Sequence, residues 1–158
     1  MNYKAYLDMK ITELESFSNQ ELIEYIESIY EKLYRLGKNY NEVLNTKINP
    51  LLMQESIKMM TFDGVIDQEA QNAIMQIQMG YFSPADLPYQ QIIVNESYQD
   101  IDFAFKRFLM GLKEIDAEVF QNFFTTMIDY YIAIALLNQM FGNKQLNYIN
   151  ELIDNLTY

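Results

Sequence analysis

The stretch AEVFQNFFTTMIDYYIAIALLNQMF, residues 117–141, is the most apolar segment of its length in the chain and decides the fold. Its second half, YYIAIALL, has no polar side chain on any helical face except the tyrosine hydroxyls. A helix without a polar face must be surrounded by other helices, so a buried central helix is predicted over residues 117–141. The first half keeps a polar stripe at the three- and four-residue spacing of one helix face: Glu118, Asn122, Thr125 and Asp129.

Amphipathic segments before this stretch predict helices that surround it. Ser18 and Glu21 match the capping box, in which each side chain binds the other residue's backbone N–H group. We expect one helix from this cap to about residue 47. The pair Asn49-Pro50 ends that helix, because the residue before proline is pushed out of helical geometry. Along the helix, apolar residues alternate at four and three residues and form a seam that could pair with a second copy in a homodimer: Leu22, Ile26, Ile29, Leu33, Leu36, Tyr40 and Val43.

The rest of the chain shows further helical periodicity and one irregular part. Asp116 is predicted to cap the central helix, and residues 81–96, which contain two prolines, are predicted to form an irregular loop. The sequence therefore predicts an all-α protein, a single-domain bundle of six or seven helices around the central one. The other expected helices cover residues 3–16, 50–60, 67–79, 97–115 and 146–156.

Charge and composition exclude several classes of function. The 158-residue chain has 11 basic and 22 acidic residues, a net charge of −11, which disfavours direct nucleic-acid binding and favours encounter with a basic protein surface. It contains no Cys and no His, so the usual zinc ligands, the thiol nucleophile and the commonest general base are missing. No phosphate-binding glycine motif occurs. We therefore expect no cofactor and no enzymatic activity.

The start of the chain and its hydropathy bear on localisation. The first residues, MNYKAYLDMKITELES, do not resemble a signal peptide, and no stretch has the roughly twenty nearly continuous apolar residues that a membrane span needs. We expect no membrane partner and a cytoplasmic protein. The abundance of Asn, Ile, Tyr and Lys is typical of an AT-rich genome and suggests a bacterial cell or a phage-infected host.

One acidic helix face is the first candidate for a functional site. An E-x-x-E spacing places carboxylates on one helical face, where a divalent cation could be held, and this pattern resembles the all-helical nucleotide pyrophosphohydrolases. Those enzymes carry a second acidic pair on a neighbouring helix, whereas the next E-x-x-D here runs from Glu151 to Asp154. A solvated acidic face is the preferred interpretation, and its residues are candidates for binding a partner: Glu21, Glu24, Glu27 and Glu31.

A short acidic turn is the second candidate. The string DGVIDQE, residues 63–69, resembles the inner half of a helix-loop-helix calcium loop and the loop of TerB-like helical domains. Aligned on Gly64, the calcium pattern places Met59, Thr61 and Ala70 at the first, third and twelfth positions, so the usual carboxylate ligands fail at all three. A capped turn is the preferred interpretation, with partner-binding candidates Asp63, Asp67 and Glu69.

Asp129 is the one charged residue beside the most apolar segment. It continues the polar stripe of the central helix, so we expect an exposed or partner-facing position. The alternative is a carboxylate with a perturbed pKa and a functional role.

Three functions follow from these observations. The first is a non-enzymatic acidic module that inhibits or antagonises a basic protein target, of a phage or mobile-element type, by mimicking nucleic-acid charge. The second is a homo-oligomeric helical scaffold paired through the seam. The third is a divalent-metal hydrolase built on carboxylates.

Overall fold

The computed structural model is an all-helical bundle around the predicted central helix, α7 (Ala117–Leu137). Asp116 caps this helix as expected, because its side chain accepts from the backbone N–H groups of Glu118 at 3.0 Å and Val119 at 3.2 Å. Every residue from 126 to 135 is buried, which confirms that this part of the helix has no solvent-exposed face. The structure describes residues 1–40, 42–62, 68–79, 101–138 and 141–156, and within the helices the side chains of 37–40, 42–50, 61, 71 and 78–79 are not described.

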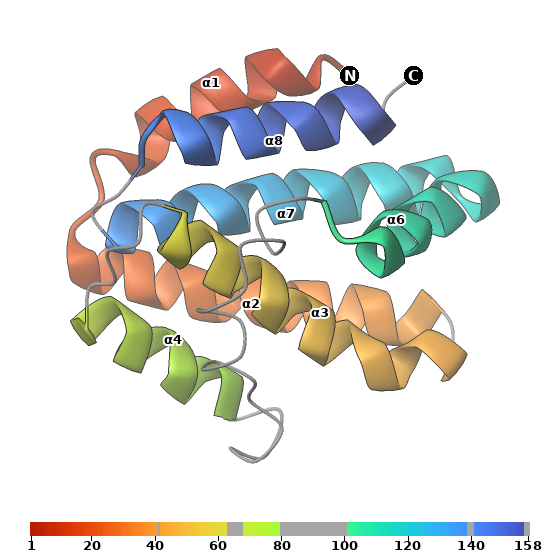
Figure 1. Cartoon of the computed structure of the whole chain (residues 1–158), viewed down its shortest axis with the longest axis horizontal. Helices are drawn as coiled ribbons and strands as arrows, with labels where there is room; N and C mark the ends of the chain where they lie inside the picture. Colours follow the sequence, from red (N-terminus) through yellow and green to blue (C-terminus); the bar gives the residue numbers. More distant parts are fainter. Residues whose placement is uncertain (41, 63–67, 80–100, 139–140, 157–158) are drawn as a thin grey trace.

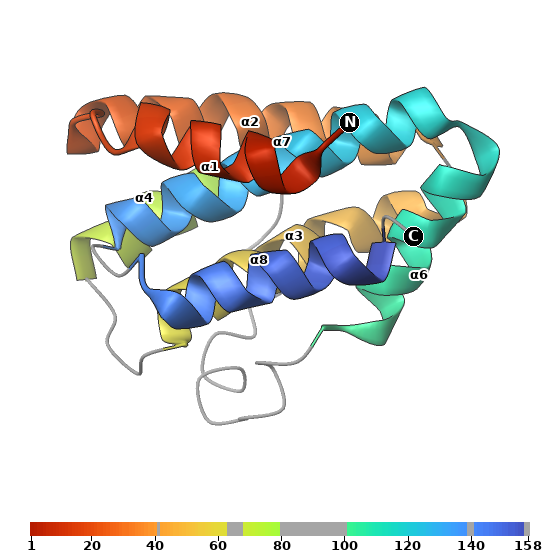
Figure 2. The ribbon, with the colours of Figure 1, turned by 90° about the horizontal axis from the view of Figure 1, so that it is seen from above.

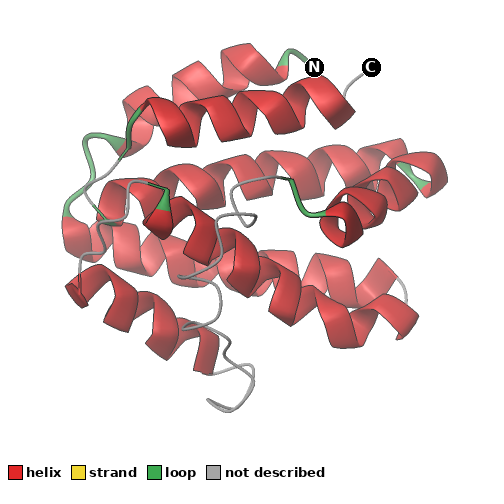
Figure 3. Ribbon diagram, viewed as in Figure 1, coloured by secondary structure: helices red, strands yellow, loops and turns green. Residues whose placement is uncertain are grey.

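Within those ranges all regular structure is helical, and seven helices are present (Figure 3). The predicted all-α class is confirmed. The predicted loop over residues 81–96 lies outside the described residues. Besides α7, the helices are α1 (Tyr3–Leu14), α2 (Asn19–Tyr40), α3 (Glu42–Thr61), α4 (Gln68–Met79), α6 (Phe103–Ile115) and α8 (Asn143–Leu156).

The helices are arranged as layers on α7, which contacts α1, α2, α3, α6 and α8 (Figures 1 and 2). Helix α4 packs on α2 instead. One cluster of buried apolar side chains contains residues from all seven helices. Aromatic rings fill much of it, and Tyr30 of α2 meets Tyr130 of α7 with ring centroids 5.9 Å apart.

Helix α2 begins with the predicted capping box. The Ser18 hydroxyl accepts from the Glu21 N–H, and the Glu21 carboxylate accepts from the Ser18 N–H, both at 3.2 Å. The first four seam residues are buried against the rest of the same chain, and Leu36 is half-buried. The side chains of Tyr40 and Val43 lie outside the described residues. The core of one chain therefore accounts for the described part of the seam, Leu22, Ile26, Ile29, Leu33 and Leu36, without a second copy.

The prediction that one helix runs to about residue 47 and stops at Asn49-Pro50 is wrong. Helix α2 ends at Tyr40, and α3 begins at Glu42 and continues through Pro50. A proline inside a helix costs about 3 kcal/mol, because it lacks the N–H that would bond one turn back. The residues after it, including Leu52 and Ile57, are buried in the core, and their packing offsets this cost.

The helix before α7 also begins later than predicted. Its cap is Asp102, whose side chain accepts from the Phe105 N–H at 2.9 Å, so α6 starts at Phe103. The first four residues of the predicted helix, 97–100, lie outside the described residues. Helix α6 lies at one end of the bundle and leads through Asp116 directly into α7 (Figure 2).

Candidate functional site

The acidic face of α2 consists of Glu21, Glu24, Glu27 and Glu31, and all four side chains are exposed. Glu31 pairs with Arg35 at 2.6 Å, and Glu24 accepts a hydrogen bond from Gln20 at 3.3 Å. These are contacts within one exposed helix surface, and such pairs contribute little to stability. The α2 carboxylates therefore stand in solvent along the outside of the bundle, where a partner can reach them.

The acidic turn at residues 63–69 is described only at its end. Glu69 is exposed in the first turn of α4. Asp63 and Asp67 lie outside the described residues, and so does the turn on which the calcium-loop and TerB-like resemblances depend. Across the described ranges, no three acidic side chains come together in a group that could hold a metal ion.

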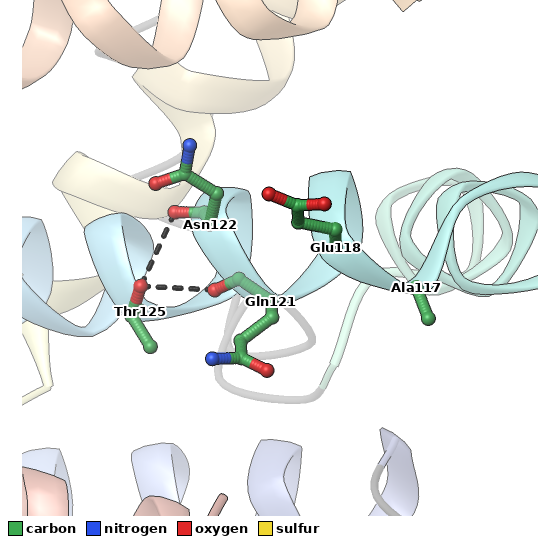
Figure 4. Close-up of a pocket in the computed structure, with 5 residues that line it drawn as sticks. All are labelled: Ala117, Glu118, Gln121, Asn122 and Thr125. Atoms are coloured by element: carbon green, nitrogen blue, oxygen red, sulfur yellow. Dashed lines mark hydrogen bonds between the residues drawn. The ribbon is translucent and has the colours of Figure 1, made fainter.

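The polar stripe of α7 lines a hollow on the surface of the bundle. The hollow has a volume of about 440 Å³ and is lined by Ala117, Glu118, Gln121, Asn122 and Thr125. Figure 4 shows the Glu118 and Asn122 side chains pointing to one side of the helix and Gln121 to the other. The Thr125 hydroxyl donates to the backbone carbonyls of Gln121 and Asn122, at 2.9 and 3.2 Å (Figure 4). The hollow offers hydrogen-bonding groups and one carboxylate to a ligand.

Asp129 continues this stripe one turn beyond Thr125, but the prediction that it is exposed or partner-facing is wrong. Its exposed fraction is 8%. Helix α1 covers it, and the Tyr6 hydroxyl donates to its Oδ1 at 2.7 Å. The polar stripe on α7 predicts a solvent-exposed Asp129. A buried carboxylate needs a polar partner, and Tyr6, 123 positions away in the chain, supplies it.

Electrostatics at Asp129 match the alternative interpretation, a perturbed carboxyl group. Burial raises the pKa of Asp129, and the hydrogen bond from Tyr6 and the charge of Lys10 only partly offset this effect. Burial and the bond to Asp129 likewise raise the pKa of Tyr6 far above its ordinary value. Burial alone would lower the pKa of Lys10, but the charge of Asp129 and the contact with Glu13 outweigh it and raise that pKa. The Tyr6 hydroxyl and the charge of Lys10, both from α1, therefore favour the ionised form of Asp129 against the effect of its burial.

A second polar cluster lies fully inside the bundle, where α3, α7 and α8 meet. Glu55 and Lys58 of α3 are 0% and 1% exposed, and Lys58 Nζ lies 3.1 Å from Glu55 Oε2. The other carboxylate oxygen, Oε1, accepts from the hydroxyls of Tyr131, at 2.5 Å, and Tyr148. Lys58 also donates to the Tyr148 hydroxyl at 3.4 Å and lies 5.3 Å from the centre of its ring.

This buried Glu55, Lys58, Tyr131 and Tyr148 cluster ties three helices together and is closed to solvent. Burial first, and then the charge of Glu55, raise the pKa of both tyrosines well above the ordinary value. Their hydroxyls therefore stay protonated and keep donating to Glu55 throughout the neutral range. Sequence reasoning missed the cluster. Its signal was a pair of opposite charges three residues apart in LLMQESIKMM, a segment whose other residues are mostly apolar.

Comparison of the chain with protein-family models, with curated proteins and with solved structures found no match. Among the helices that the structure describes, none is long and apolar enough to cross a membrane.

Proposed function

We propose that the protein is a non-enzymatic acidic module that binds a basic surface on another protein through the exposed face of α2, and so blocks that surface. The observation that carries this proposal is the alignment of Glu21, Glu24, Glu27 and Glu31 along one solvent-exposed helix face. Two of the other candidates, Asp63 and Asp67, lie outside the described residues, and Glu69 is a single exposed acid on α4.

The spacing of these carboxylates suits a surface that recognises regular negative charge. Ten residues of helix separate the first from the last, a rise of about 15 Å, or about one charge per 5 Å. A nucleic-acid strand carries one charge per about 3.4 Å of its axis. The carboxylates on the α2 face are therefore somewhat more widely spaced than the phosphates of a nucleic-acid strand. A basic groove that binds a phosphate backbone would also attract this face.

The test compares two variants of equal net charge. The first neutralises the face, as Glu21→Gln, Glu24→Gln, Glu27→Gln and Glu31→Gln. Glutamine at position 21 preserves the capping box, which accepts either side chain. The control neutralises four exposed acids outside α2 and outside α6, as Asp8→Asn, Glu15→Gln, Glu118→Gln and Glu151→Gln. Each variant raises the net charge of −11 by four.

A dodecalysine peptide serves as a defined basic probe, and its affinity is measured by calorimetry at several salt concentrations. We expect the α2 variant to bind at least about tenfold more weakly than the control, and its dependence on salt to be shallower, because fewer charges meet the probe. Equal losses in both variants would show that only net charge matters and would reject α2 as the docking site. An affinity that does not change with salt would reject charge mimicry.

A further inference from the structure

Helix α6 exposes an unusual amount of apolar surface. Five large hydrophobic side chains are exposed in the described chain, and three of them lie on this helix. Their exposed fractions are 73% for Phe103, 44% for Met110 and 72% for Ile115. The opposite face of α6 packs on α7 and α8 (Figures 1 and 2). Solvent-facing apolar side chains gathered on one short helix are typical of a surface that contacts another macromolecule.

The exposed stripe of α6 combines these apolar groups with one charge of each sign. Phe103, Arg107, Met110 and Glu114 follow one another at spacings of four, three and four residues, so they share one face. Arg107 and Glu114 are exposed, and the Arg107 guanidinium lies 5.8 Å from the centre of the Phe103 ring. The two charges are seven residues apart, two turns along the same face. When a second copy of this stripe runs antiparallel to the first, the basic residue of each copy faces the acidic residue of the other.

We propose that this stripe is the interface of a homodimer, in which α6 packs antiparallel to α6 of a second copy about a two-fold axis beside Met110. In this register Arg107 of each subunit lies opposite Glu114 of the partner subunit, so the two-fold symmetry gives two ion pairs. The two Met110 side chains lie near the axis. The dimer differs from one built on the α2 seam, whose first four residues are already covered within one chain.

The distribution of charge favours this face over the others. The chain as a whole has a net charge of −11, so two copies repel each other over most of their surfaces. Helix α6 is the exception, since it carries three basic residues and one acidic residue. Lys106 and Lys113 donate to the end of α8, to Asn155 at 3.3 Å and to the Leu156 carbonyl at 2.6 Å. Contact through α6 therefore brings two acidic subunits together where the electrostatic repulsion between them is weakest.

Sedimentation equilibrium with three proteins tests the proposal. The wild-type chain should dimerise as its concentration rises. Arg107→Glu places like charges opposite each other twice and should weaken dimerisation at least about tenfold. The swap Arg107→Glu with Glu114→Arg restores opposite charges in the same register and should restore the dimer. A wild-type chain that stays monomeric, or an Arg107→Glu chain that dimerises equally well, would overturn the proposal.

Cross-linking locates the contact independently, because the chain has no cysteine of its own. Met110→Cys places one thiol beside the proposed axis, and Met9→Cys places one on α1 at a similar exposure of 54%. A disulfide needs its Cα atoms within about 7 Å, which only residues near the axis meet. We expect mild oxidation to cross-link the Met110→Cys protein and to leave the Met9→Cys protein monomeric. Equal cross-linking of both proteins would mean random collision and would contradict the proposed interface.

Discussion

The Tyr6 hydroxyl and the Asp129 carboxylate lie 2.7 Å apart although 123 positions separate them in the chain. This bond closes α1 over the polar stripe of α7. It explains why the last carboxylate of that stripe is buried while Glu118 and Asn122 remain exposed. Helix α1 also makes an exposed ion pair with α8, in which Lys4 Nζ lies 2.9 Å from Asp154 Oδ1. The Tyr6–Asp129 bond therefore adds a buried polar contact to the apolar packing of Leu7 and Leu14 that holds α1 on the bundle.

The first prediction concerns pH. Burial raises the pKa of Asp129 above its ordinary value of 3.8, so the folded chain holds this proton more tightly than the unfolded chain does. Its contribution to stability is therefore fully present below the ordinary pKa and is lost as the pH rises through the raised, folded-state pKa. Asp129→Asn keeps an oxygen that accepts from Tyr6 and removes the charge. We expect this variant to lose that part of the pH dependence and to be at least as stable as the wild type at neutral pH, measured by urea denaturation. A variant less stable at pH 7 and unchanged at pH 3 would contradict the assignment.

The second prediction concerns the donor. Tyr6→Phe removes the hydroxyl and leaves the Asp129 carboxylate with less compensation for its burial. A hydrogen bond to a charged group contributes about 1.5–3 kcal/mol, and we expect a loss of that order at neutral pH and a smaller loss where Asp129 is protonated. Tyr3→Phe is the matched control, because Tyr3 is a half-buried tyrosine of the same helix whose ring packs on Phe124 with centroids 5.1 Å apart. Equal losses in the two variants would argue against a specific role of the Tyr6 bond.

The third prediction concerns the buried ion pair of α3. Removing one partner of a buried pair costs about 3–5 kcal/mol, because the other charge is left in the core without its counter-charge. We expect losses of that order for Glu55→Gln and for Lys58→Met, measured by chemical denaturation. The double variant should be more stable than the sum of the two losses implies, since glutamine can still accept from Tyr131 and no charge remains at either position. Losses that simply add would mean that Glu55 and Lys58 do not act as a pair.

The fourth prediction concerns the turn between α6 and α7. Asp116 ends one helix and caps the next, so Asp116→Ala leaves the N–H groups of Glu118 and Val119 without their acceptor. We expect a loss of about 1 kcal/mol, and a smaller loss for Asp116→Asn, which is as good a cap. Thermal unfolding of both variants measures the difference. Equal destabilisation by alanine and asparagine would show that the charge matters rather than the cap.

Local signals in the sequence predict the central helix and the amphipathic helices that surround it. The caps at Ser18 and Asp116 were found because capping depends on residues three positions apart or fewer. The segment from Tyr130 to Leu137 is predicted to lie in the core because it has apolar or aromatic side chains on every helical face. The all-α class followed from these elements.

Features that depend on distant contacts were not predicted. No proline or glycine separates the end of α2 at Tyr40 from the start of α3 at Glu42, whereas Pro50 is a strong helix breaker. Local signals therefore point to Pro50, although core packing carries α3 through it. The partners of Asp129 and of Glu55 are tyrosines 123 and 76 positions away in the chain. No local periodicity connects such residues. Charged residues inside apolar segments were the available signal, and each of them required a buried partner.

The most direct test of the proposed α2 surface is a titration of the isotopically labelled chain with the dodecalysine peptide, followed by NMR. The backbone amides of residues 19–36 should shift together on binding, and the shifts should vanish as salt is raised, because the contact is electrostatic. Amides of α1, α6 and α8 serve as internal controls, since these helices also carry exposed acids. Shifts concentrated on α2 are the predicted result. Shifts spread evenly over every acidic helix, or centred on a helix other than α2, would contradict the account.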